Sequence, residues 1–138
     1  MPGPIASARG ILEKEGNPGA IELKEGDILR DELGERWDLI LAVHTVHLFN
    51  ANQNREFFTR IQKALSPGGA VVVIDQFLGT GKIPDVVASL ISLAFFTVGG
   101  RVYGVQEIRR LLRESGFSRV RTKPFRFRAP AALIEGWK

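Results

Sequence analysis

Four polar side chains able to take part in chemistry follow the strand-like segments of this 138-residue chain. Asp27 comes after a short apolar segment, His44 and His47 follow a longer one, and Asp75 closes a third. Ligands of open α/β sheets lie beyond the carboxyl ends of the strands, where the strand order reverses. The sequence therefore predicts that these four groups gather at one edge of a sheet, around a small-molecule site.

The spacing of the two histidines raises the question of a metal site. His44 and His47 are three residues apart, but they follow a strand instead of lying on a helix, and there is no third histidine to complete such a site. The absence of cysteine excludes disulfides, thiolate catalysis and cysteine-based zinc sites. We therefore expect no metal at this position.

Basic side chains are concentrated near the C-terminus, although the net charge is only +4. Arg119, Arg121 and Lys123 alternate with other residues, so they share one face of a predicted strand. One interpretation is a patch for nucleic acid or an acidic substrate. The other is a charged edge strand that discourages sheet-to-sheet association. The second is favoured, because no aromatic stacking motif or helix-turn-helix pattern accompanies the charge.

Alternating helices and strands must position the four polar groups. The run Trp37–Val43 is almost continuously apolar, which is typical of a parallel strand covered on both faces. Apolar residues at helical spacing and Gly or Pro at segment ends mark the other elements. The expected helices are 7–16, with Ser7 as its cap, 52–65, 85–98 and 105–115, and the expected strands are 20–24, 37–43, 70–74, 117–123 and 132–137.

Chain length and hydropathy set the broad class. At 138 residues, residues 1–138 are expected to form a single α/β domain. No apolar run reaches the length of about 18 residues that a membrane span needs, and the N-terminus lacks the pattern of a signal peptide. We therefore expect a cytoplasmic protein without membrane contact.

Four segments carry a family resemblance: EGDIL at 25–29, RWDLILAVHTVHLF at 36–49, IQKALSPGGAVVVID at 61–75 and GGRVYGVQEIRRLLRESGF at 99–117. In content and order they resemble class I S-adenosylmethionine-dependent methyltransferases, and among these the small-molecule O-methyltransferases. The most specific piece is L-S-P-G-G before a Val-rich strand. The resemblance covers the C-terminal part of the catalytic domain. It implies a Rossmann-like methyltransferase sheet and transfer of a methyl group from S-adenosylmethionine to a hydroxyl of a small molecule.

The resemblance also implies residues that hold the cofactor. Asp27 matches an acid that accepts a hydrogen bond from the adenine amino group, and Ile28 matches the residue that packs on the ring. Val43 falls at a further cofactor contact, where many relatives have a polar or basic residue. The alternative for Asp27 is a turn aspartate that binds local backbone N–H groups.

Catalytic roles come from the same resemblance. His47 matches the general base that takes the proton of the substrate hydroxyl, a task suited to a side chain that titrates near neutral pH. Asp75 and Glu107 match two acids that hold the ring of this base. The alternatives are a loop histidine without a catalytic role and, for Glu107, a first-turn carboxylate favoured by the helix dipole. Leu48 and Phe49 stand where relatives often carry Asp-Trp, so the surroundings of His47 are less polar.

Some features of the family are missing from this sequence. The Gly-rich loop after the family's strand 1 and the acid after its strand 2 are absent, and 20 residues precede Ile21. The expected fold is therefore partial, with the family's strands 3–7 including a C-terminal antiparallel hairpin, and with strands 1 and 2 absent. In the family order 3-2-1-4-5-7-6 this removes the centre of the sheet. The family's strand 3 would then pair directly with strand 4, or leave an open edge that another chain could fill.

Three functional hypotheses follow from the sequence. The first is a truncated or split O-methyltransferase, with a small hydroxylated molecule as methyl acceptor and an N-terminal chain as complement. The second is a non-catalytic remnant that forms a homo-oligomer through its open edge and the helix 85–98, and acts as a dimerising or binding module. The third, a nucleic-acid-binding protein on the same frame, is the least favoured.

Overall fold

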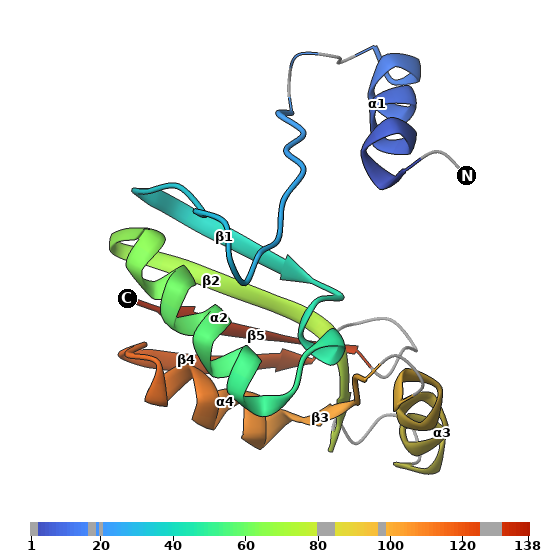
Figure 1. The fold of residues 1–138 in the computed structure, drawn as a ribbon. Helices are drawn as coiled ribbons and strands as arrows, with labels where there is room; N and C mark the ends of the chain where they lie inside the picture. Colours follow the sequence, from blue (N-terminus) through green and yellow to red (C-terminus); the bar gives the residue numbers. More distant parts are fainter. Residues whose placement is uncertain (1–2, 17–18, 20, 80–84, 97–98, 125–130) are drawn as a thin grey trace. The chain divides into compact units, whose positions relative to one another are not determined.

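The computed structural model describes residues 3–16, 19, 21–79, 85–96, 99–124 and 131–138 and consists of two compact units. The N-terminal unit is Met1–Asp31, and the sheet unit is Glu32–Lys138 (Figure 1). Each unit is described by itself. The prediction of one domain over residues 1–138 stays a prediction.

The N-terminal unit contains one helix, α1 (Pro4–Lys14), among its described residues. The helix begins at Pro4, whose fixed φ and missing N–H suit the first turn, and Gly3 is its N-cap. The predicted cap at Ser7 is therefore wrong. The predicted strand at 20–24 is also wrong over its described residues, because 21–24 pair with no other strand there. A strand is stable only when a neighbour accepts its ladder of hydrogen bonds.

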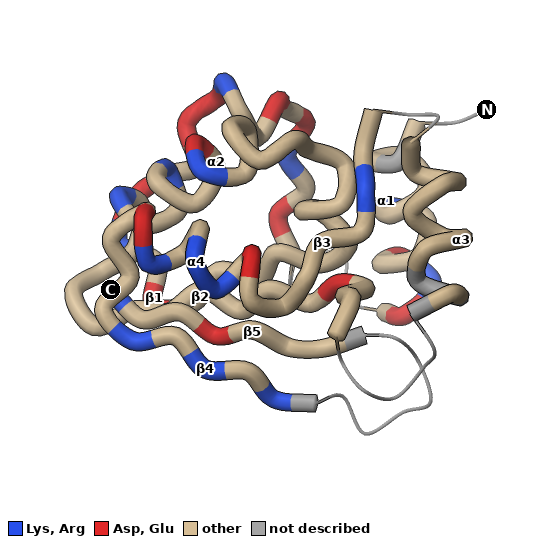
Figure 2. Tube along the Cα trace, turned by 90° about the horizontal axis from the view of Figure 1, so that it is seen from below, with Lys and Arg blue, Asp and Glu red and all other residues tan. Residues whose placement is uncertain are grey.

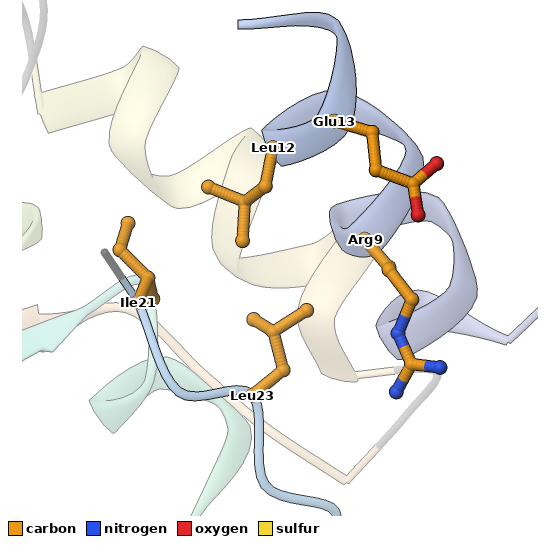
Figure 3. A pocket seen from close by; sticks show the side chains of 5 residues that line it. All are labelled: Arg9, Leu12, Glu13, Ile21 and Leu23. Carbon is orange, nitrogen blue, oxygen red and sulfur yellow. The ribbon is translucent and has the colours of Figure 1, made fainter. Parts of the chain in front are cut away.

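A shallow pocket of about 270 Å³ lies inside the N-terminal unit (Figure 3). Leu12 of α1 faces Ile21 and Leu23 of the segment that follows, and Arg9 and Glu13 stand at the rim. These apolar side chains give α1 a packing partner within its own unit.

The sheet unit is built on a mixed sheet with the order β1-β2-β5-β4. Its strands are β1 (Trp37–Val43), β2 (Leu65–Leu78), β3 (Tyr103–Gly104), β4 (Arg119–Pro124) and β5 (Ala131–Trp137). β1 and β2 are parallel, β5 is antiparallel to β2 and β4, and β3 pairs with the end of β2. This is the order 4-5-7-6 that the resemblance implies for the family's last strands. The α/β fold class is confirmed, and β2 extends well beyond the predicted 70–74.

Three helices and a single 3₁₀ turn accompany the sheet within the described part of this unit. They are η1 (Val46–Leu48), α2 (Ala51–Ala64), α3 (Asp85–Phe96) and α4 (Val105–Glu114). α2 and α4 lie side by side on one face of the sheet, and α3 lies beyond the end of β2 (Figure 1). The core is between the two helices and the sheet, where Phe58, Ile61, Val71, Ile108 and Ile134 are fully buried. No helix in the described ranges is both long and apolar enough to cross a bilayer.

The opposite face of β1 is not covered by any described element of the sheet unit. Leu39, Leu41 and Val43 are 52%, 58% and 47% exposed, and they alternate along the strand that forms the sheet edge. Val72 and Ile74, their neighbours on β2, are half-buried. The prediction that Trp37–Val43 is covered on both faces is therefore wrong for the described residues. A continuous apolar run is typical of a strand with a packed layer on each face, but the run itself does not determine whether the second layer is present.

The basic residues Arg119, Arg121 and Lys123 lie on β4, at the other edge of the sheet, where Figure 2 shows blue segments along the trace. The Arg119 guanidinium lies 4.1 Å from the Trp137 ring centre, and that of Arg121 lies 5.8 Å from it. Lys123 Nζ is 2.8 Å from a Glu135 carboxylate oxygen. Each of the three therefore meets a side chain of β5, which favours the interpretation of a charged edge strand.

Candidate functional site

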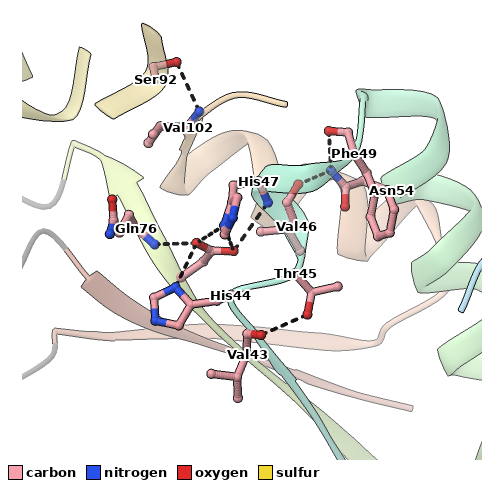
Figure 4. Close-up of polar contacts among 11 residues, drawn as sticks. Val43, His44, Thr45, Val46, His47, Phe49, Asn54, Gln76, Ser92 and Val102 are labelled. Carbon is pink, nitrogen blue, oxygen red and sulfur yellow. Dashed lines mark hydrogen bonds and ion pairs between the residues drawn. The ribbon is translucent and has the colours of Figure 1, made fainter. Parts of the chain in front are cut away.

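The site is built on the loop that connects β1 to α2. The loop leaves β1 with a hydrogen bond from His44 N–H to Ile74 O at 2.9 Å, and it then forms the 3₁₀ turn η1. Asn54 of α2, fully buried, donates from Nδ2 to Val46 O at 2.9 Å and to Phe49 O at 3.3 Å. Because both ends of η1 are tied to the same side chain, the backbone at His47 is fixed (Figure 4).

α2 begins with a capping box directly after this turn. The Asn50 side chain accepts from Gln53 N–H at 3.0 Å, and the Gln53 side chain accepts from Asn50 N–H at 3.0 Å. The Tyr103 hydroxyl donates to Phe49 O at 2.6 Å. The loop therefore has a defined exit into α2 and a contact with β3.

His47 and Asp75 form a buried hydrogen-bonded pair at the carboxyl ends of β1 and β2. His47 Nδ1 lies 2.8 Å from Asp75 Oδ1 and 3.1 Å from Oδ2, and the His47 backbone N–H donates to Oδ2 at 3.4 Å. His47 is 7% exposed and Asp75 is fully buried. A carboxylate at Nδ1 holds the ring with its proton on that nitrogen, which leaves Nε2 as the basic atom of the neutral ring.

The His47 ring and backbone are packed between α3 and the segment before β3. The Phe95 ring of α3 stacks on the His47 ring, with centroids 4.0 Å apart and planes inclined by 14°. Arg101 N–H donates to His47 O at 2.9 Å. A Cβ on Gly100 would lie 2.0 Å from His47 O, so only glycine allows this close approach of the two backbones.

His44 is a second histidine at the same carboxylate. Its Nδ1 lies 3.7 Å from Asp75 Oδ1, and its side chain is 57% exposed. Asp75 Oδ1 also accepts from Gln76 N–H at 2.8 Å (Figure 4). His44, His47 and Asp75 each offer a ligand-type atom, and these atoms all lie within 4.8 Å of one another. The sequence has no third histidine, and in the structure the third group beside the two histidines is the Asp75 carboxylate.

Glu107 is linked to this site through Arg101. It forms an ion pair with the Arg101 guanidinium and has no hydrogen bond to His47 in the described part of the chain. Burial acts to lower the pKa of the Arg101 guanidinium, but the hydrogen bond and charge of Glu107, aided by Tyr103, raise that pKa above its ordinary value. Arg101 therefore carries its charge at every relevant pH, and it also donates its N–H to His47 O.

The predicted cofactor contacts lie in two different units. In the N-terminal unit, Asp27 Oδ1 accepts from Leu29 N–H at 2.9 Å, and Arg30 approaches Oδ2 at 3.4 Å. These are the contacts of a turn aspartate, although the carboxylate is exposed and Ile28 beside it is half-buried. In the sheet unit, Val43 stands with an exposed side chain at the carboxyl end of β1. The adenine roles stay predictions.

Residues 1–118 match the sequence model of the O-methyltransferase domain family. The chain belongs to the O-methyltransferase family. A protein described as the tetracenomycin polyketide synthesis 8-O-methyl transferase TcmO, from Streptomyces glaucescens, is 35% identical to it over 99 residues. That match covers 70% of the chain and 29% of the relative.

Solved structures of this O-methyltransferase family superpose on most of the chain. The mitomycin 7-O-methyltransferase MmcR is 25% identical with a TM-score of 0.86, over 97% of this chain and 39% of that one. Human N-acetylserotonin methyltransferase, solved in complex with SAM, is 25% identical with a TM-score of 0.72, over 83% of this chain and 33% of that one. The chain therefore spans between a quarter and a half of the length of these family members.

Several residues that contact His47 or its loop were not predicted as site residues from the sequence of this chain. The sequence places Asn54 and Phe95 on expected helices, and Gly100 and Arg101 in the family segment 99–117, but nothing local distinguishes their contacts with η1. A buried Asn in an otherwise apolar helix face was the one usable signal, since buried amides need partners.

Proposed function

We propose that this chain provides the C-terminal part of the catalytic domain of an S-adenosylmethionine-dependent O-methyltransferase that acts on a hydroxyl of a small molecule. Family membership supports the reaction class. The observation that carries the proposal is the buried contact of 2.8 Å between His47 Nδ1 and Asp75 Oδ1. A histidine held in this way by a carboxylate is suited to accept a proton.

His47 is the proposed general base. Its Nε2 accepts the proton of the substrate hydroxyl, and Asp75 keeps the ring in the required tautomer and stabilises the imidazolium that forms. Phe95 restricts the ring to one plane by stacking on it. Glu107 acts in this proposal through Arg101, whose N–H anchors the His47 carbonyl, rather than by touching the ring.

The proposed cofactor contacts are Asp27, Ile28 and Val43. In the N-terminal unit, an exposed carboxylate next to a half-buried apolar side chain fits the edge and face of an adenine ring. The role of Val43, in the sheet unit, rests on its position in the family segment alone. When bound, the cofactor supplies an electrophilic methyl group for the substrate oxygen. The SAM complex of the human relative supports this choice of cofactor.

A further polypeptide segment is part of the proposal. It would supply the Gly-rich loop that the sequence lacks, either from a longer form of this protein or from a separate chain. The uncovered apolar residues Leu39, Leu41 and Val43 on the edge strand β1 support such a complement, since apolar strand edges recruit further strands. Assembly of two copies of the chain is the other way to cover them.

The second candidate function is a non-catalytic binding module. The observation that favours it is an apolar stripe on α3 formed by Val86, Leu90 and Leu93, which are 63%, 64% and 66% exposed. Their spacing of four and three residues places them on one side of the helix. A stripe of this kind suits a partner helix more than water.

Cofactor titration separates the two candidates. We expect S-adenosylmethionine to bind the chain assembled with its complementing segment with a dissociation constant of about 1 μM, equivalent to about −8 kcal/mol. Asp27→Ala should weaken this binding, while Glu22→Ala, also an exposed position in the same unit, should not. In the enzyme assembled from this chain and the further segment, His47→Gln should lower kcat by a factor of about 10²–10⁴ without changing the affinity for the cofactor. A stable oligomer that binds no cofactor, alone or complemented, would support the binding module instead.

A further inference from the structure

We propose that the edge strand β4 docks an acidic, extended segment of another protein, which adds to the sheet as a further strand. β4 pairs with β5 alone among the described strands and stands at the opposite end of the strand order from β1. The proposed catalytic and cofactor residues lie on other elements. This inference therefore goes beyond the proposed function and does not depend on it.

The outer edge of β4 offers backbone groups to a partner. A strand at the edge of a sheet has a row of N–H and C=O groups that no neighbouring strand satisfies, and an extended peptide can pair with them. β4 is six residues long, so it can pair with a partner segment of similar length. In this mode of binding the main-chain hydrogen bonds supply affinity, and the side chains select the partner.

Two cationic groups on this strand have no carboxylate partner. Arg119 and Arg121 are exposed, and neither guanidinium has a carboxylate oxygen within 4.0 Å among the described residues. Lys123, by contrast, pairs with Glu135, so its charge is compensated. The uncompensated positive charge of β4 therefore belongs to the two arginines.

Trp137 of β5 orients both arginines on one face of the sheet. Their guanidiniums lie 4.1 Å and 5.8 Å from the centre of its ring. Alternate residues of a strand share a face and recur about every 7 Å. Two acids at alternate positions of an added strand would therefore stand opposite Arg119 and Arg121, and opposite charges in this arrangement stabilise the pairing.

The same features argue against two other partners. If two copies of the chain paired through β4, arginines would face arginines, which is destabilising. A single-stranded nucleic acid would neutralise the arginines but leave the backbone edge unpaired, and the Trp137 ring on which a base would stack already carries the Arg119 guanidinium. An acidic peptide satisfies both the charges and the backbone.

The test is the fluorescence anisotropy of a short labelled peptide, in which three glutamates alternate with valines, titrated with the whole chain. We expect a dissociation constant of ~100 μM or tighter. A peptide of the same composition with its glutamates in one block should bind about fivefold more weakly, because only alternation sets the acids opposite the arginines. Arg121→Glu should weaken binding by about tenfold, since it turns an attraction into a repulsion.

The control is Arg113→Glu, which makes the same change of net charge at an exposed position of α4. It should bind the peptide like the original chain. Because Arg121 is exposed, its variant is expected to fold, and an unchanged circular dichroism spectrum verifies this. The milder Arg121→Gln should weaken binding to a smaller degree.

Absence of binding up to ~1 mM, the weak end of specific binding, would overturn the proposal. Equal affinity for the two peptides would overturn it as well, because the strand edge would then play no part. An equal loss of affinity in Arg121→Glu and Arg113→Glu would show attraction by net charge alone. Tighter binding of a labelled oligothymidylate than of the alternating peptide would replace the acidic segment by a nucleic acid.

Discussion

Replacement of Asp75 by asparagine tests whether the buried carboxylate holds His47 in place. Asparagine has the same shape, so the change leaves no cavity, but one of its two oxygens becomes an NH₂ group. Asp75 Oδ1 accepts from Gln76 N–H and lies 2.8 Å from His47 Nδ1, while Oδ2 accepts from the His47 backbone N–H. The single oxygen of the amide can replace either Oδ1 or Oδ2 as a hydrogen-bond acceptor, but not both.

The magnitude follows from these contacts. With its oxygen at the Oδ1 position, the amide directs its NH₂ group at the His47 N–H, and a buried donor left without an acceptor costs about 1–3 kcal/mol. The ring also loses a charge-assisted hydrogen bond, which is roughly twice as strong as a neutral one. Removal of a buried charge offsets part of this loss. We therefore expect Asp75→Asn to lower the free energy of unfolding by about 2 kcal/mol.

Urea unfolding followed by tryptophan fluorescence measures this difference. Trp37 and Trp137 both belong to the sheet unit, so the signal reports the unit that contains the site. With a slope of about 2 kcal/mol per molar urea, the midpoint should fall by roughly 1 M. Glu107→Gln is the matched carboxylate control. It breaks a partly exposed ion pair and should cost less than about 1 kcal/mol.

A second measurement follows the ring itself. Imidazole NMR signals should place the His47 proton on Nδ1 in the original chain, and His44→Gln assigns the two histidines. If Asp75→Asn shifts the urea midpoint no more than Glu107→Gln does, the carboxylate is not holding His47. His47 would then not be a base whose ring Asp75 fixes.

Three further predictions concern the frame around the site. Gly100→Ala should lower the free energy of unfolding by about 1–3 kcal/mol, because the new Cβ meets His47 O at 2.0 Å; Gly104→Ala, with open space around it, is the control in the same urea assay and should cost at most about 1 kcal/mol. Asn54→Ala should cost about 1–3 kcal/mol by leaving Val46 O unpaired, whereas the exposed Asn52→Ala should change the melting temperature little. Arg36→Gly should raise that temperature, because Arg36 has a φ of 63° and this backbone conformation costs a non-glycine residue about 1 kcal/mol; an unchanged or lower value would contradict this reason.

Most of the fold was predictable from local pattern. The helices at α2 and α4 and the strands β1, β4 and β5 lie within a few residues of their predicted bounds, because periodicity, capping and Gly or Pro breaks act over short distances. The two-residue strand β3 was missed, since it exists only by pairing with the end of β2. The expected strand at 20–24 failed for the opposite reason, as its apolar residues have no strand partner in the described part of the chain.

The sequence by itself determined the class of fold, the family and the residue types at the carboxyl ends of the strands. Only the tertiary structure decided which of these residues meet. His47 and Asp75 are 28 residues apart and touch because parallel pairing of β1 with β2 brings their ends together. His44 joins them, while Glu107 pairs with Arg101 instead. Hydrogen-bond geometry depends on tenths of an ångström between distant segments, and local sequence patterns do not encode such distances.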